Sequence, residues 1–249
     1  MSGGRVIRTP EEQSKYQRLG RVGLVKVGYK DEAGKPHSSD FFIPDGEYAE
    51  QFDKAFGKEP KKLKIVFYTD DQEEVCNERI ECWGTKQSGD EGKLLAFGDG
   101  ETFFAFDPKT EDYTKRLNKE QAREIKGRWR LLLTMKFLLP QIPIVGYWQL
   151  TTSGKESSIP GIIAMFDWAM KTGGSVSMYP WDLTVKFCTS KKPGSKSRYP
   201  VIQILPNLSY QQVEALRDAR KELDAMPGLI TAERVEKVMQ EKMQLEAPK

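Results

Sequence analysis

Apolar and polar residues alternate with a period of two in the middle of the chain. Between Lys126 and Pro140 one side of the pattern is mainly apolar and the other is mainly basic. The apolar side carries Trp129, Leu131, Leu133, Met135 and Phe137, and the opposite side carries Arg128, Arg130, Thr134 and Lys136. Because successive side chains of a strand point to opposite faces, the pattern predicts a half-buried strand with a basic outer face.

Around this strand the pattern predicts a strand–strand–helix–strand unit that ends at Cys188. Residues 144–151 are rich in β-branched and aromatic residues, which is typical of a strand. Residues 157–171 repeat apolar positions at spacings of three and four and stop at two glycines, as an amphipathic helix does. Residues 181–187 alternate again. We expect these elements to form one sheet with the helix packed on it.

Further strands are predicted on both sides of this unit. They cover residues 19–29 and 38–43 as a hairpin, then 61–68, 79–85, 94–97, 102–106 and 199–205. Glycines within the first of them indicate bulges or a close approach of another group to the backbone. Short helices are expected at 45–56 and 119–124, and the rest of residues 107–125 is polar.

The two ends of the chain differ from its middle. Residues 1–18 are polar and are expected to form a flexible basic arm. A Ser-x-x-Gln capping box at Ser209 starts a helix, and a second helix starts at Thr231. The predicted fold class is therefore α+β. A β-rich core of mostly antiparallel strands with one packed central helix spans residues 19–206, and a C-terminal helical pair occupies residues 207–249.

Composition indicates the class of protein and the compartment in which it works. Charged residues make up 30% and apolar residues 38% of the 249 residues, which is typical of a globular chain. No apolar run reaches the roughly 18 residues of a membrane helix, and the N-terminus lacks the apolar segment of a signal peptide. The three cysteines have unrelated spacings, which agrees with a reducing compartment. We expect a cytoplasmic protein without a membrane partner.

The sequence nominates no catalytic residue, because the common phosphate-loop, nucleophile-elbow and zinc-protease patterns are absent. The single histidine, His37, has no cysteine or carboxylate at a useful spacing. The acidic run from Asp70 to Glu78 suits either a hard cation or a solvated loop. Cys76 and Cys82 are the metal candidates, but a structural zinc ion needs about four ligands. No cofactor is predicted, and zinc is the metal left open.

Basic and aromatic residues interleave in the central strand. Arg128 and Arg130 flank Trp129, and Lys136 continues the basic face. Cations that follow phosphates and rings that stack on bases suit nucleic acid, although the net charge of +3 does not indicate it alone. The alternative is that the tryptophans belong to the core and the arginines solubilise the outer face. The predicted nucleic-acid-binding residues are Arg128, Arg130, Lys136, Lys191, Lys192, Lys196 and Arg198.

A series of short motifs also points to a family. The motifs are Leu19-Gly-Arg-Val22, Arg79-Ile-Glu-Cys-Trp-Gly84, Arg130-Leu-Leu-Leu133 to Leu138-Leu-Pro140, Gly146-Tyr-Trp-Gln-Leu-Thr-Thr-Ser153, and Gly173-Gly174 before Pro180-Trp-Asp-Leu183. In this order they resemble the recombination directionality factors of actinophages and related mobile elements, which are often labelled hydrolase or metal-binding. The resemblance covers most of residues 19–206. It implies a non-enzymatic accessory factor that binds a large serine integrase on DNA and switches it from integration to excision.

The chain departs from this family in one respect. Many relatives carry a cysteine-rich insertion that suggests zinc, whereas residues 86–106 contain no cysteine here. The metal is therefore not carried over with the resemblance. The hydrolase label finds no support in these residues either.

Three functions remain as hypotheses. The first is the directionality factor, with a serine integrase as partner and DNA contacted directly or through the integrase. For this function we predict partner contact through Val235, Val238 and Met239, which share a stripe of the second C-terminal helix. The alternative is a single-stranded nucleic-acid-binding protein for phage replication or annealing. The third is a metal-binding protein.

Overall fold

The computed structural model describes residues 19–177, 179–190 and 197–224. Within these ranges, eleven strands form two mostly antiparallel sheets, accompanied by five α-helices. The predicted α+β class with a packed central helix is confirmed. The predicted arm at residues 1–18 and the second C-terminal helix, with Val235, Val238 and Met239, lie outside the described residues.

The larger sheet has eight strands in the order β2-β1-β9-β8-β4-β5-β6-β7. These strands are β1 (Arg21–Lys30), β2 (Pro36–Asp45), β4 (Cys76–Trp83), β5 (Leu94–Gly98), β6 (Thr102–Asp107), β7 (Asp112–Asn118), β8 (Arg128–Phe137) and β9 (Tyr147–Thr152). Only the β1–β9 pair within this sheet is parallel. The bulges predicted from the glycines of β1 are present, and Gly23 leaves no room for a Cβ beside the ring of Trp148.

The smaller sheet has three strands in the order β11-β10-β3. These are β3 (Lys62–Val66), β10 (Pro180–Thr189) and β11 (Arg198–Pro206), and the helices are α2 (Ala49–Phe56), α3 (Gln72–Val75), α4 (Lys119–Arg123), α5 (Ser158–Gly173) and α6 (Tyr210–Asp224), with a 3-10 turn η1 (Lys86–Ser88). The expectation of one sheet between Lys126 and Cys188 is wrong. Helix α5 connects β9 in the large sheet to β10 in the small one, because β10 pairs with the distant β3 and with β11.

Two other elements differ from the sequence prediction. Strand β7 occupies part of residues 107–125, for which no strand was predicted, and α3 forms within the acidic run. Strand β7 escapes a pattern search because it is an edge strand whose one fully buried residue is Leu117. Helix α3 is short and is capped by Asp71, whose carboxylate accepts a hydrogen bond from the backbone N–H of Glu73.

The main core lies where α5 packs against both sheets. The Phe166 ring of α5 lies 4.8 Å from Phe67 and stacks on Trp181 at 6.1 Å. Ser158 of the same helix accepts a hydrogen bond from the backbone N–H of Ile202 in β11. Trp148 packs on Phe52 of α2 at 5.5 Å, so residues far apart in the sequence close one core.

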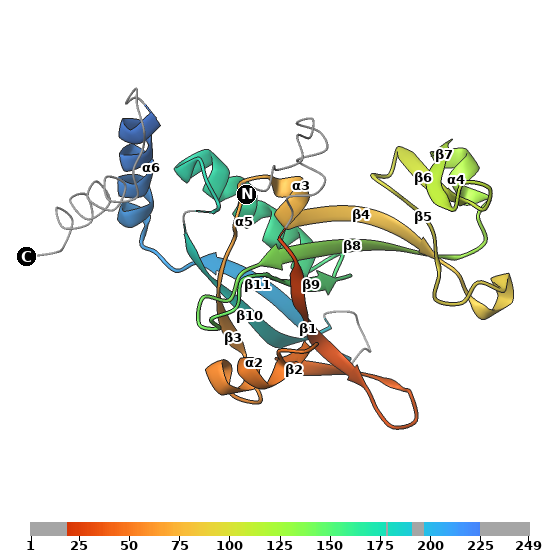
Figure 1. The fold of residues 1–249 in the computed structure, drawn as a ribbon, viewed down its shortest axis with the longest axis horizontal. Coiled ribbons are helices and arrows are strands. Elements are labelled where there is room, and N and C mark those ends of the chain that lie inside the picture. The colour runs from red at the N-terminus through yellow and green to blue at the C-terminus, as the bar shows by residue number, and fades with distance from the viewer. Residues whose placement is uncertain (1–18, 178, 191–196, 225–249) are drawn as a thin grey trace, which may run out of the picture.

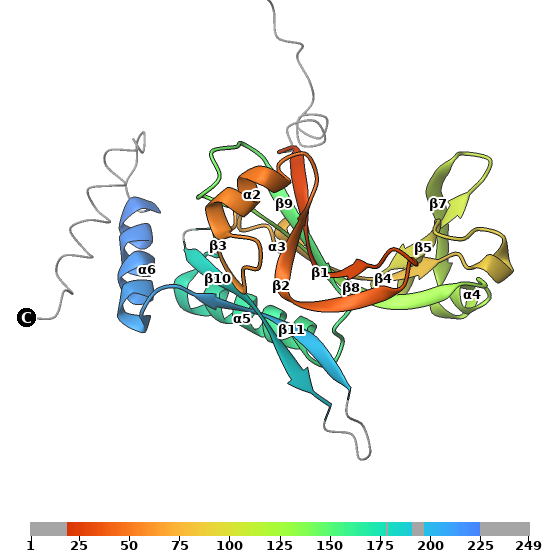
Figure 2. The same cartoon turned by 90° about the horizontal axis from the view of Figure 1, so that it is seen from below.

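A second, small core lies beyond the main body. It contains Cys82, Ala96, Phe103, Ala105, Leu117 and Ala122. We call residues 84–127 the distal lobe and the paired strands β4 and β8 the stalk. The stalk runs from Cys76 opposite Met135 in the main core to Cys82 opposite Trp129 in the small core. Figure 1 shows these two long strands reaching from the main body to the lobe, and in both Figure 1 and Figure 2 α6 lies at the opposite end of the molecule.

Candidate nucleic-acid interface on the stalk and distal lobe

Strand β8 presents its cations on one face of the large sheet. Leu133, Met135 and Phe137 are buried, whereas Arg128 and Arg130 are exposed, so the predicted alternation is confirmed. We call the face that carries these two arginines the outer face. The opposite face covers both hydrophobic cores.

The pairing register places five outer-face residues in one transverse row. The row runs across β8, β4, β5, β6 and β7 as Arg130, Glu81, Phe97, Phe104 and Arg116. Directly paired residues of neighbouring strands point to the same face of a sheet. Four steps between strands, at about 4.8 Å each, give the row a length of roughly 19 Å. Arginine therefore ends the row on both sides, and two aromatic rings lie between.

Glu81 is the acidic member of the row, and its charge is already paired. Its side chain is buried, and its carboxylate accepts hydrogen bonds from Arg79 and from Nε1 of Trp83, the latter at 2.8 Å. The guanidinium of Arg79 also lies 5.0 Å above the Phe97 ring. A carboxylate that is covered and bonded by a guanidinium offers little repulsion to an approaching anion.

Among the described residues, Arg128 and Arg130 have no carboxylate partner. Neither residue forms an ion pair within the part of the chain that the structure describes. Burial, and after it the nearby charge of Arg128, lower the pKa of Arg130 from its ordinary value. An arginine still stays protonated at neutral pH, so two positive charges lie near each other on the same face of β8. An anion bound between them would relieve their repulsion.

Two grooves meet at Arg130. The first, of about 650 Å³, lies between the start of the distal lobe and the end of β9 and includes Lys86, Arg128 and Ser153. The second, of about 740 Å³, lies between β1, β9 and the start of β11 and includes Arg21, Lys26 and Tyr199. Lys26 is paired with Asp45. Hydroxyl groups and cations occur in the lining of both grooves, together with Glu91 in the first, and hydroxyls and cations are the groups that bind phosphate oxygens.

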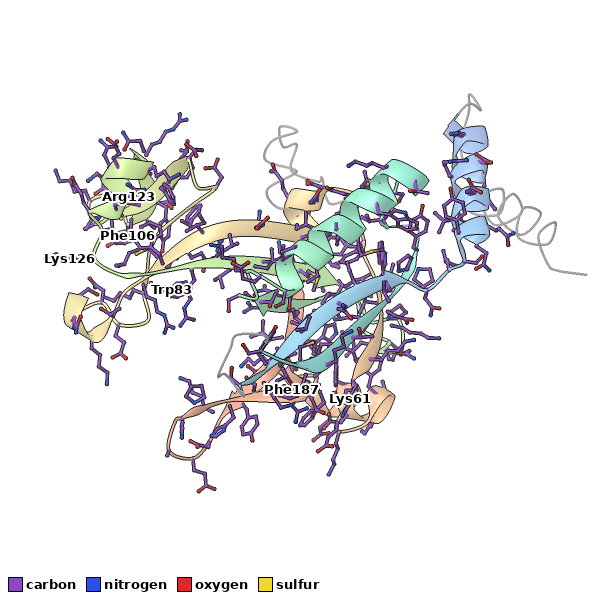
Figure 3. The ribbon with its side chains drawn as sticks, turned by 180° about the vertical axis from the view of Figure 1, so that it is seen from behind. Lys61, Trp83, Phe106, Arg123, Lys126 and Phe187 are labelled. Carbon is purple, nitrogen blue, oxygen red and sulfur yellow. The ribbon has the colours of Figure 1, made fainter. Side chains whose placement is uncertain are left out.

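An exposed cluster of aromatic residues continues the outer face onto the distal lobe. We call Phe97, Phe104, Phe106 and Tyr113 the aromatic patch. Phe97 lies 5.9 Å from Phe104 and 5.3 Å from Tyr113, and Phe106 lies 5.6 Å from Tyr113. Phe104 and Phe106 are 37% and 41% exposed. Figure 3 shows Phe106 on the lobe and Trp83 close to where the stalk meets it.

The remaining predicted cations lie elsewhere. Lys136 shares the outer face but sits six residues from Arg130, about 20 Å along the strand, with its Nζ 5.4 Å from the Tyr147 ring. Arg198 stacks over Phe187 at 5.1 Å, on the small sheet. Lys191, Lys192 and Lys196 fall outside the described residues. Of the seven predicted residues, the grooves bring together Arg128 and Arg130.

The tryptophans near these cations belong to the interior. Trp148 is fully buried, Trp129 packs edge-on against Phe103 at 5.2 Å, and Trp168 packs against the main core. The exposed rings of the aromatic patch, by contrast, were not predicted from the sequence. Strand β6 carries apolar residues on both faces, and this is the signal that could have drawn attention to Phe104 and Phe106.

The metal candidates do not converge. Cys76 and Cys82 lie six residues apart on β4, about 20 Å, in different cores, so they cannot bind one zinc ion. Burial, and then the charge of Glu78, raise the pKa of the Cys76 thiol to about 12, which opposes the thiolate form that zinc needs. Among the described residues, no group of three or more His, Cys, Asp or Glu side chains is placed to hold a metal.

The other acidic and histidine candidates have structural partners. Asp70 accepts hydrogen bonds from Ser175 Oγ and from the backbone N–H groups of Val176 and Ser177, which joins the start of the acidic run to the loop after α5. His37 bonds to Asp31 at 2.8 Å in the β1–β2 hairpin. In the described part of the chain, no helix is both long and apolar enough to cross a membrane.

Comparison with known proteins identifies one family. The family model described as "Gp3-like: Recombination directionality factor-like" matches residues 21–207. The matched segment includes the stalk, the distal lobe and both grooves. No curated protein and no solved structure matches the chain.

Proposed function

The chain belongs to the recombination directionality factor-like family, and we propose from this membership that it binds a serine integrase–DNA complex and favours excision. It does so without chemistry of its own. A factor of this kind redirects a reaction by binding one conformation of the complex more tightly than another, because only a difference in affinity shifts the population.

The family match over residues 21–207 is the observation that carries this proposal. The unpaired cations at Arg128 and Arg130 support a direct contact with DNA, since phosphates would supply the missing negative charge. Such contacts position a protein on DNA without selecting its sequence. Sequence choice would then come from the integrase, and the factor would add affinity for one geometry of the complex.

For the integrase contact we keep the prediction of Val235, Val238 and Met239. These residues lie outside the matched segment as well as outside the described residues. An apolar stripe on a helix suits a groove or a second helix on a partner protein. DNA contact and integrase contact are thus assigned to different parts of the chain, which makes them separable by mutation.

The test is a recombination assay with the purified protein and the serine integrase of the same mobile element. Addition of the protein should raise the yield from excision substrates and lower the yield from integration substrates. Val235→Ala/Val238→Ala/Met239→Ala should abolish integrase capture, whereas Arg128→Gln/Arg130→Gln should keep capture and weaken DNA binding. An unchanged ratio of excision to integration with the wild-type protein would overturn the proposal.

A matched control removes two charges elsewhere. Lys54 and Lys58 are exposed on α2 and just after it, and neither forms an ion pair among the described residues. Lys54→Gln/Lys58→Gln lowers the net charge as much as the arginine variant does. It should leave both DNA binding and the ratio of excision to integration unchanged.

A further inference from the structure

The exposed rings of β6 are not needed to build the distal lobe. Phe103 and Ala105 point into the small core, whereas Phe104 and Phe106 point away from it on the outer face. Rings that stay 37% and 41% exposed leave apolar surface in water on a part of the molecule whose core is small. We therefore expect these two rings to contact a ligand on the outer face.

Arginines flank the patch, although the hollow lined by Phe97 and Phe104 also contains Glu73, Glu78 and Asp99. Arg116 pairs with Phe104 across the β6–β7 register, and Arg79 lies over Phe97. Arg130 ends the transverse row on the other side. Arg116 and Arg130 form no ion pair within the described ranges, so the row carries an arginine at each end, with the two backbone positions roughly 19 Å apart.

Among the described residues, no carboxylate forms an ion pair with Arg116 or Arg130. Glu81 is bonded to Arg79 and Trp83, as described above. Asp99 lies within electrostatic reach of Arg116 and offsets part of its charge, but it forms no ion pair with Arg116, and its Oδ1 accepts backbone N–H bonds from Glu101 and Thr102 at 2.8 and 2.7 Å. The ligand that fits is therefore anionic at its ends and flat and apolar between them.

Single-stranded DNA has this chemistry. Its phosphates carry the charge and its unpaired bases expose flat faces that stack on aromatic side chains, and sheet faces of comparable size hold two or three bases in this way. A duplex hides the faces of its bases inside the stack, so it could satisfy the arginines but not the rings. The choice of DNA over RNA rests on the proposed function.

We propose that the aromatic patch and the arginines beside it form a binding site for single-stranded DNA. Bases stack on Phe104 and Phe106, and phosphates lie near Arg116 and Arg130. The first groove, which includes Arg130, continues the path of the DNA strand toward Lys86 and Arg128. The site goes beyond the proposed function, because it binds DNA in the absence of an integrase.

The test measures the affinity of the full chain for a short labelled oligothymidylate at low salt, by fluorescence anisotropy. Phe104→Ala/Phe106→Ala should weaken binding at least about tenfold, since stacking on one ring contributes at that level. Tyr210→Ala, which removes a 59% exposed ring from α6 at the other end of the molecule, should leave the affinity unchanged. Both variants change exposed residues, and equal thermal melting would verify that they fold.

Several results would overturn the proposal. The first is that the wild-type protein does not bind the oligothymidylate, and the second is that wild type and Phe104→Ala/Phe106→Ala bind it with equal affinity. The others are that the wild-type protein prefers duplex DNA, or that it binds the matching RNA more tightly. Loss of integrase capture in Phe104→Ala/Phe106→Ala without any single-strand binding would assign the patch to a protein partner instead.

The oligothymidylate test and the recombination assay can each refute one proposal without refuting the other. A protein that controls excision but ignores the oligothymidylate refutes the single-strand site and leaves the proposed function standing. A protein that binds the oligothymidylate through its rings but never alters recombination refutes the proposed function alone.

Discussion

The main body and the distal lobe are built on cores of very different size. The main core buries large side chains such as Phe52, Phe166 and Trp181 between two sheets and α5. Half of the fully buried side chains of the small core are alanines, and Phe103 is its one buried ring. The stability of the lobe therefore depends on its pairing with the stalk as much as on its own packing. The exposed rings therefore lie on the region with the smaller core, and Arg128 and Arg130 lie at the end of the stalk that adjoins it.

The largest effect should follow from a truncation in the main core. Phe166→Ala removes the ring that contacts both Phe67 and Trp181 and should lower the free energy of unfolding by about 4 kcal/mol, since the cavity cannot fully collapse. Urea unfolding measures it. Met170→Ala on the same helix, at a 38% exposed position, is the control and should cost far less. An equal fall in the free energy of unfolding in the two variants would mean that Phe166 does not anchor α5 in the main core.

A truncation in the small core should have a smaller and more local effect. Phe103→Ala removes the ring packed on Trp129 and should cost about 3 kcal/mol. Amide hydrogen exchange should speed up in β5, β6 and β7, whereas the main body should keep its protection. Phe104→Ala, on the opposite face of the same strand, should leave exchange nearly unchanged. Uniform loss of protection through both regions would contradict the division into two cores.

The main body should also respond to acid through Asp70. Burial raises the pKa of this carboxyl, but the hydrogen bonds from Ser175, Ser177 and Val176 outweigh it and lower the pKa to about 2. A depressed pKa in the folded state stabilises the protein above the unfolded value of about 4, and this contribution disappears as the pH falls through about 2. After allowance for solvent screening it amounts to about 1 kcal/mol.

The Asp70 contribution is measurable by urea unfolding across this pH window. Wild type should lose stability relative to Asp70→Asn as the pH falls from about 4 to about 2. Asp167→Asn, which changes an exposed carboxylate on α5, is the control and should follow the wild-type curve. Parallel curves for wild type and Asp70→Asn would show that the charge of Asp70 does not stabilise its contact with the loop after α5.

Local patterns predicted the strands well and their partners poorly. The alternation in β8 placed Arg128 and Arg130 on an exposed face, because a period of two is a property of one strand. Membership of β10 in the small sheet depends on pairing with β3, more than a hundred residues earlier, and no local pattern carries that information. The segment Asp112–Asn118 has too few buried positions to alternate.

The candidate site shows the same limit. The transverse row exists only through the registers that join β8 to β4 and β4 to the lobe, so its rings could not be associated with Arg130 from the sequence. Phe104 and Phe106 lie among apolar neighbours on both sides of β6, and composition alone does not say which side faces the small core. The structure supplies the register, and with it the continuity of cations and rings.

The salt dependence of DNA binding tests directly whether the outer face contacts phosphates through Arg128 and Arg130. The measurement compares wild type with Arg128→Gln/Arg130→Gln on a labelled single strand and on a duplex of the same sequence, over a salt series. Each lost phosphate contact should reduce the slope of log affinity against log salt by about 1, so the variant's slope should be shallower by about 2. Parallel slopes for wild type and variant would contradict the account.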